Sequence, residues 1–129
     1  MARAEKVGSF PWDRDFRYSQ AMRVGDLVFV SGQAAIGEGG KVVGEGDFMA
    51  QAQQVFANLK AILEGAGSSL ERVVKVGIFI TDMGYFPQIV ELRGRYFSEP
   101  YPADTIVQVE ALALPGLMLE IEAVATVDG

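Results

Sequence analysis

Two alternating segments within residues 101–127 constrain the fold more than any other part of the sequence. In the second of them, apolar side chains take every other position, while Glu120 and Glu122 fall on the opposite side of the extended chain. A similar alternation runs through residues 104–111, and the Pro115-Gly116 pair between the two runs is typical of a turn. We therefore predict two antiparallel β-strands, each with one apolar face and one face that carries carboxylates.

The earlier part of the chain predicts further strands. Residues 18–24 and 27–31 are rich in strand-forming residues and flank a short turn, and residues 73–80 are apolar on nearly both sides. Residues 1–16 are mixed in character and predict one short irregular strand and a loop.

Two segments predict helices. Apolar residues recur at three-four spacing after Asp47, which suits an N-cap, and this helix should end at Gly65 or Gly67. Pro87 suits the first turn of a second helix, and the helix should stop before Pro100.

The order β-β-β-α-β-α-β-β predicts a single α+β domain over residues 1–129, because helices of this number and length cover only one face of a sheet of about six strands. The uncovered face also holds large apolar groups, and such a face usually meets another subunit, so we expect an oligomer. Alternation assigns five polar side chains to this face: Asp104, Gln108, Glu110, Glu120 and Glu122.

Composition narrows the chemistry. The chain has no cysteine and no histidine, so a thiol nucleophile and the commonest general base and metal ligand are both absent, and proton transfer falls to carboxylates, Tyr, Lys, Arg or water. The net charge of −6 argues against a nucleic-acid partner, since no basic stripe is present. No apolar run reaches the roughly 18 residues of a membrane span, and we expect a cytoplasmic protein without a membrane partner or a cofactor.

Several short motifs, spread in order over nearly the whole chain, carry a family resemblance. The sequence resembles the RidA/YjgF family, also known as endoribonuclease L-PSP or reactive intermediate deaminase, through Tyr18-Ser19-Gln20, residues 27–33 (LVFVSGQ), 58–61 (NLKA), 73–76 (VVKV), Tyr101-Pro102-Ala103 and 119–123 (LEIEA).

The resemblance implies a chorismate-mutase-like fold, a homotrimer with small-molecule clefts between subunits, and hydrolysis of enamine or imine intermediates to keto acids and ammonia. It implies that Glu120 positions or activates the attacking water. It also implies that Tyr18, Ser31, Gly32 and Ala103 line the cleft. For Tyr18, a packing role stays open beside that of a hydrogen-bond donor to the ligand.

One residue departs from the family pattern in an informative way. The Pro-Ala pair is followed in the family by an arginine that binds the substrate carboxylate, and here Asp104 follows it. A carboxylate repels the group that a guanidinium would hold in a bidentate pair, so the resemblance implies weak or absent activity on simple imino acids. Val90 also departs, since it stands where the family commonly has asparagine, and Arg17 is a further candidate to supply the missing positive charge.

Two hypotheses follow. The chain is either a RidA-like hydrolase or deaminase of a small enamine- or imine-type metabolite, with Asp104 selecting a neutral or cationic substrate, or a trimer that binds a small molecule without turnover. If Asp104 and Glu120 share one cleft, one carboxyl pKa should rise and the two should form an acid/base pair. Two carboxylates without further ligands make a poor metal site, and we expect none. Arg93 and Arg95 are interpreted as solvated helix charges.

Overall fold

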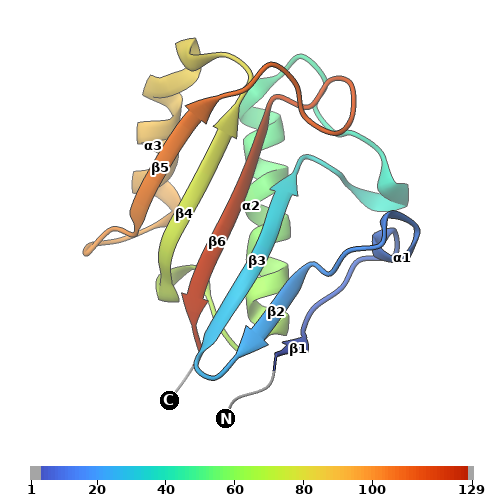
Figure 1. The fold of residues 1–129 in the computed structure, drawn as a ribbon. Coiled ribbons are helices and arrows are strands. Elements are labelled where there is room, and N and C mark those ends of the chain that lie inside the picture. The colour runs from blue at the N-terminus through green and yellow to red at the C-terminus, as the bar shows by residue number, and fades with distance from the viewer. Residues whose placement is uncertain (1–3, 128–129) are drawn as a thin grey trace.

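The structure, a computed structural model, describes residues 4–127 and shows an α+β domain (Figure 1). Three single 3₁₀ turns, at Glu38–Gly40, Leu70–Arg72 and Met83–Tyr85, connect the larger elements. The strands and α-helices are β1 (Glu5–Lys6), α1 (Asp13–Phe16), β2 (Ala21–Val24), β3 (Leu27–Ala34), α2 (Phe48–Gly65), β4 (Val73–Ile80), α3 (Phe86–Tyr96), β5 (Ala103–Gln108) and β6 (Leu119–Thr126).

The six strands form one mixed sheet in the order β1-β2-β3-β6-β4-β5. Only β4 and β5 pair in parallel; all other neighbours are antiparallel. The two alternating runs of residues 101–127 are therefore both strands, and they run antiparallel, but they do not pair. β4 lies between them, because the long connection after β5 carries the chain across to the centre of the sheet (Figure 1).

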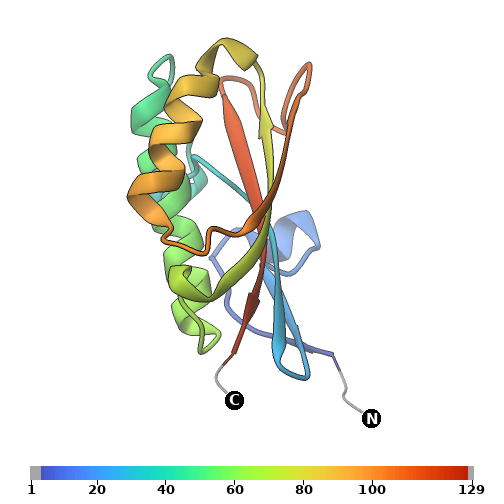
Figure 2. The ribbon, with the colours of Figure 1, turned by 90° about the vertical axis from the view of Figure 1, so that its left-hand side faces the viewer.

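Helices α2 and α3 lie on the same face of the sheet, as the sequence predicts (Figure 2). The Asp47 side chain accepts a hydrogen bond from the Ala50 N–H at 3.0 Å, and the helix that it caps ends at Gly65. Stacking of Phe56 on Tyr96, with ring centroids 4.1 Å apart, joins the two helices. The helix layer and the inner face of β6 thus form one apolar core.

A buried glutamine ties α2 to the segment that leads into β6. The Gln51 Nε2 group donates to the Gly116 carbonyl at 2.7 Å, and the Met118 N–H donates to Gln51 Oε1 at 2.8 Å. Because both polar atoms of one side chain are used, the start of β6 is fixed relative to the helix. Glu120 lies two residues further on.

The predicted faces are correct for β6 and wrong for β5. In β6 the predicted apolar face, which includes Leu119 and Ile121, is buried. In β5, Asp104 pairs in register with Val76, a buried residue of β4, so Asp104 faces the helices and Val107 is 41% exposed on the open face. The apolar content of β5 was a poor guide, because the inward side of this edge strand holds the charged Asp104 together with Ile106, and the Asp104 carboxylate is paired with Arg93 of α3.

Among residues 4–127, no helix combines the length and the apolar character that crossing a bilayer requires. The predicted strand within residues 1–16 is the two-residue β1, followed by the single turn of α1, which the sequence did not predict. Residues 1–3 of that segment lie outside the described part of the chain.

Candidate functional site

A cavity with a polar floor lies where β3, β6 and α1 meet, and it has a volume of about 470 Å³. The floor comes from the end of β3, where the pairing with β6 shifts register between Val30 and Gln33. We call this space the Glu120 cavity. Its lining residues are Trp12, Phe16, Tyr18, Gln20, Ser31, Gly32, Gln33, Ala34, Ile36, Asn58, Ala113, Leu114, Leu117 and Glu120.

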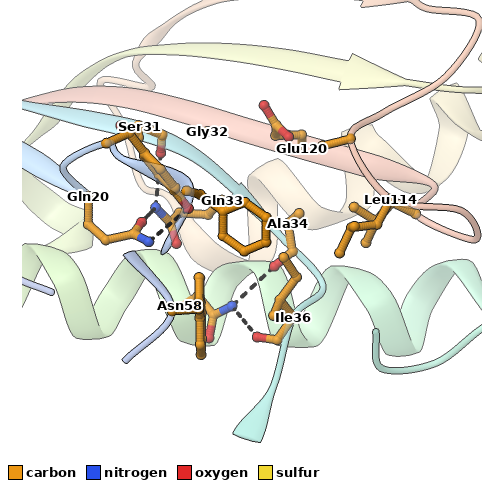
Figure 3. A pocket seen from close by; sticks show the side chains of 14 residues that line it. Gln20, Ser31, Gly32, Gln33, Ala34, Ile36, Asn58, Leu114 and Glu120 are labelled. Carbon is orange, nitrogen blue, oxygen red and sulfur yellow. Dashed lines mark hydrogen bonds between the residues drawn. The ribbon is translucent and has the colours of Figure 1, made fainter. Parts of the chain in front are cut away.

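The Glu120 side chain lies over Gly32 of the neighbouring strand β3, as Figure 3 shows. A Cβ atom added to Gly32 would overlap the Glu120 carboxylate and would lie 2.7 Å from its Cγ atom. Real Cβ atoms do not approach other atoms this closely, so only glycine at position 32 allows this placement of the carboxylate. The glycine of the Ser31-Gly32 motif therefore shapes the cavity, because its lack of a side chain leaves room for the Glu120 carboxylate.

The environment of Glu120 raises the pKa of its carboxyl above the ordinary value of 4.5. Burial is the larger cause, because it disfavours the charged form, and the negative charge of Glu122 on the same face of β6 adds to it. Glu122 itself lies over Gly77 of β4, where an added Cβ would be 2.9 Å from Glu122 Oε2. A carboxylate with a raised pKa is a stronger base, which suits proton transfer.

A chain of side-chain hydrogen bonds supports the opposite end of the cavity. Gln20 donates through Nε2 to the buried Asp13 carboxylate and to the Tyr18 hydroxyl oxygen, the latter at 3.0 Å. Gln33 donates through Nε2 to Gln20 Oε1 at 2.7 Å and to the Ser31 carbonyl at 3.0 Å. Since the Tyr18 oxygen accepts from Gln20, its own hydrogen points elsewhere and can serve a ligand.

The other walls of the cavity are apolar. Trp12 and Phe16 come from α1 and the turn before it, and Leu114 comes from the connection between β5 and β6. Glu120 is the only formally charged residue among those that line this space. The ring of Trp12 is stacked on Phe10 with centroids 4.7 Å apart. A ligand here would meet one carboxylate in a mainly apolar pocket.

Asp104 lies in another part of the fold, beside a second cavity of about 470 Å³ between α3 and β5. Its carboxylate accepts two hydrogen bonds from Arg93, from Nε and from Nη2, both at 2.9 Å. The interpretation of Arg93 as a solvated charge is therefore wrong, because α3 brings it onto the inward side of β5. Arg95 matches its interpretation: its side chain is 44% exposed and pairs with Glu91 one turn away.

The structure thus separates the predicted site residues into groups. Tyr18, Ser31, Gly32 and Glu120 line one cavity, while Val90 and Asp104 line the second. Within one chain, the expected pair of Asp104 and Glu120 in a shared cleft does not form. Two further predicted residues line neither cavity: Ala103 is exposed at the start of β5, and Arg17 is exposed after α1, with φ of 57°.

Sequence reasoning missed several residues of the Glu120 cavity. Trp12 and Phe16 lie in a segment without clear periodicity, so nothing indicated that α1 covers the end of β3. Gln20 and Gln33 could have been found, because each stands in or next to one strand of the predicted hairpin. Glutamine side chains are rarely buried, so two of them in such positions indicate a polar cluster. Among residues 4–127, no group of three or more carboxylates is placed to hold a metal ion.

Comparison with known proteins agrees with this architecture. The sequence model described as Endoribonuclease L-PSP matches residues 13–127. Protein HMF1 of Saccharomyces cerevisiae is 44% identical over 108 residues, which cover 84% of this chain and 82% of that protein. A protein of Dermatophagoides farinae named 2-iminobutanoate/2-iminopropanoate deaminase is 36% identical over 111 residues, which cover 86% of each.

A solved structure extends the likeness to three dimensions. The crystal structure of RidA from the Antarctic bacterium Psychrobacter sp. has a TM-score of 0.79 at 44% identity, covering 85% of this chain and 88% of that one. Residues 13–127, which the endoribonuclease L-PSP sequence model matches, include every strand from β2 to β6 and both long helices. The chain is therefore a member of the endoribonuclease L-PSP family, also called the RidA/YjgF family.

Proposed function

We propose that this protein is a hydrolase that deaminates a small enamine- or imine-type metabolite in the Glu120 cavity. The observation that carries the proposal is the half-buried Glu120 carboxylate, which lies over Gly32 in a mainly apolar pocket and has a raised pKa. The name of the mite relative, an iminobutanoate deaminase, supports the same reaction class.

In this reaction, a water molecule adds to the carbon of a protonated imine while Glu120 takes a proton from that water. The carbon–oxygen bond forms as the C=N π electrons move onto nitrogen. The resulting carbinolamine then breaks its carbon–nitrogen bond, ammonia leaves, and a carbonyl compound remains. Glu120 returns its proton to the departing nitrogen, and the proton of the carbinolamine hydroxyl passes to the released ammonia as the C=O bond forms. The products are a carbonyl compound and ammonium, and the enzyme ends in its starting state. The Tyr18 hydroxyl, whose oxygen accepts from Gln20, is placed to donate to an acceptor atom of the ligand.

We also propose that simple imino acids are poor substrates. Asp104 carries a negative charge where the family pattern has its substrate-binding arginine, and both of its oxygens already accept from Arg93. An imine without a carboxylate group should therefore be hydrolysed faster than the same imine with one. A ligand-binding protein without turnover is the alternative that this arrangement leaves open.

The proposed assembly is a homotrimer with ligand clefts between its subunits. The open face of the sheet exposes Met22, Phe29 and Val107 by 36%, 44% and 41%, and exposed apolar side chains on one face are a feature of subunit contacts. A measurement of molar mass in solution tests this proposal, and a monomer at micromolar concentration would contradict it.

The decisive experiment measures ammonia release from enamines generated in situ, with and without a carboxylate group. Glu120→Gln should lose at least about 100-fold in rate, because it removes the general base and keeps the side-chain shape. Glu64→Gln, a change on an exposed position of α2, is the matched control and should leave the rate unchanged. If Glu120→Gln retains full activity, the assignment is wrong. If the wild-type protein turns over neither substrate but gains about 1–3 kcal/mol of stability from them, it is a binding protein.

A further inference from the structure

The buried carboxylate of Asp13 stands at one end of the hydrogen-bond chain beside the Glu120 cavity. Only 2% of Asp13 is exposed, and both of its oxygens accept from N–H groups. The Phe10 backbone donates to Oδ2 at 2.8 Å, and Gln20 Nε2 donates to Oδ1. Asp13 does not itself line the cavity, so any effect that it has on a ligand must pass through another side chain.

Asp13 fixes the direction of the whole chain. An ionised carboxylate only accepts, so the NH₂ group of Gln20, and not its oxygen, must face Asp13. The second N–H of that group donates to the Tyr18 hydroxyl oxygen, and Gln20 Oε1 accepts from Gln33 Nε2 (Figure 3). The other N–H of Gln33 donates to the Ser31 carbonyl, which also only accepts. All four amide N–H bonds of the two glutamines are thus used, and an acceptor stands at each end.

The direction of this chain decides how Tyr18 can contact a ligand. A hydroxyl group can donate or accept, and its partners decide which of the two it does. Because Gln20 donates to the Tyr18 oxygen, the hydroxyl hydrogen is available to the cavity. With the Gln20 amide turned over, its oxygen would take that hydrogen instead, and Tyr18 would meet the ligand only as an acceptor.

We propose that Asp13 is a positioning residue of the Glu120 cavity. It orients the Gln20 amide, and through that amide it makes the Tyr18 hydroxyl a hydrogen-bond donor to the ligand. The ligand therefore carries an acceptor atom opposite Tyr18. The kinetic consequence of this inference rests on the proposed hydrolysis, whereas the orientation of the Gln20 amide can be measured without any substrate.

A double-mutant cycle tests the link between Asp13 and Tyr18. Asp13→Asn keeps the shape of the side chain but presents an NH₂ group in place of one oxygen, so the direction of the Gln20 amide is no longer fixed. Asp13→Asn and Tyr18→Phe should each reduce kcat for imine hydrolysis about tenfold, which corresponds to one hydrogen bond. The double variant should be no slower than Tyr18→Phe, because Asp13 acts only through that hydroxyl. Asp15→Asn, which changes an exposed carboxylate of α1, is the matched control and should leave kcat unchanged.

A merely structural role of Asp13 predicts a different result. Asp13 also holds the Phe10 backbone, so its replacement could act by loosening the turn before α1. The loss of rate would then add to that of Tyr18→Phe, and the double variant would be about 100-fold slower than wild type. Such additive losses, or an Asp13→Asn variant as fast as wild type, would overturn the proposal.

NMR of the side-chain amides tests the orientation directly, including the case in which Asp13→Asn does not fold. In protein with nitrogen-labelled glutamine, Tyr18→Phe should release one Nε2 proton of Gln20, which then shifts and exchanges with water faster than in wild type. The other proton should stay bonded to Asp13. If neither proton changes, the oxygen of Gln20 faces Tyr18 and the proposal is wrong.

Failure of the proposed hydrolysis gives a separate result. Full activity of Glu120→Gln, together with the shared loss in Asp13→Asn and Tyr18→Phe, would refute the role of Glu120 and support that of Asp13. If wild type turns over no imine, hydrolysis is refuted. A released Gln20 proton in Tyr18→Phe would still support the orientation by Asp13, and unchanged protons would refute it.

Discussion

Glu120 and Asp104 are carboxylates on strands of one sheet, and their surroundings differ in almost every respect. Glu120 lies over a glycine, in a mainly apolar cavity, with Glu122 as its charged neighbour, and its pKa is raised. Asp104 faces the helix layer and forms two bonds with a guanidinium. The same chemical group is thus prepared for proton transfer in one place and for holding a fixed charge pattern in the other.

The difference shows that the neighbouring strand or helix, not the residue type, decides the chemistry of a carboxylate. β3 offers Glu120 only the backbone of Gly32, which withdraws water without supplying a positive charge. α3 offers Asp104 the guanidinium of Arg93, which donates two hydrogen bonds to its carboxylate. Changes at Gly32, Arg93 and Glu122 therefore alter the surroundings of one carboxylate at a time.

The largest effect is expected when Gly32 is replaced by alanine. The added Cβ would overlap the Glu120 carboxylate, so that side chain must turn away from its position in the cavity. We expect Gly32→Ala to reduce the hydrolysis rate about 100-fold, similar to loss of a general base, with a smaller effect on the binding of substrate. Ammonia release under saturating substrate measures this loss.

Two other glycines serve as controls for Gly32→Ala. Gly65→Ala adds a methyl group at the end of α2 where nothing lies within 4 Å, and it should leave the rate unchanged. Gly77→Ala touches the mobile end of Glu122 at 2.9 Å and should have a mild effect. Equal activity of Gly32→Ala and wild type would mean that the position of the Glu120 carboxylate over β3 is not required.

The contrast between the two carboxylates also marks how far the sequence alone could lead. The alternation in β6 predicts the strand, its buried face and the place of Glu120 on the opposite face, because β6 is central and its apolar inner face is buried. The spacing of apolar residues after Asp47 and the cap itself predict α2 equally well. In both cases local pattern and tertiary packing agree.

The environment of Asp104 could not be predicted, for a physical reason. β5 is an edge strand, and on its inward face the ion pair of Asp104 with Arg93 lies beside the apolar contacts of Ile106. Alternation of apolar residues then loses its meaning, and Val107 lies on the open face. Nothing in the sequence relates Arg93 to Asp104, because their contact depends on the angle at which the helix crosses the strand.

A double-mutant cycle measures how strongly that contact holds β5 against α3. We expect a coupling free energy of about 1 kcal/mol between Arg93→Gln and Asp104→Asn, because the bonding is bidentate but the pair is partly exposed. Urea unfolding of wild type, both single variants and the double variant gives this value. The pair Arg95 and Glu91, which is more exposed, is the reference and should give about 0.3 kcal/mol. If both cycles give the same value, Asp104 is no better held than a surface carboxylate.

The smallest effect concerns the charge beside Glu120. A carboxyl whose pKa is raised on folding contributes stability that is fully present below its unfolded value of 4.5 and is lost as pH rises through the higher folded value. Glu122→Gln removes the lesser of the two causes of that rise and leaves burial in place. The acidic limb of the pH–rate profile should therefore move to lower pH, and stability at pH 7 should increase by at most about 0.5 kcal/mol, since the pair is open to solvent on one side.

The increase should disappear below pH 4.5, where Glu120 is protonated in the folded and unfolded states alike. Glu64→Gln removes an exposed carboxylate from the helix layer and serves as the control, with no expected change in the position of the acidic limb. A limb that stays in place in Glu122→Gln would mean that burial alone tunes Glu120. The glycine beneath it, and not the second carboxylate on the same strand, would then account for the whole difference from Asp104.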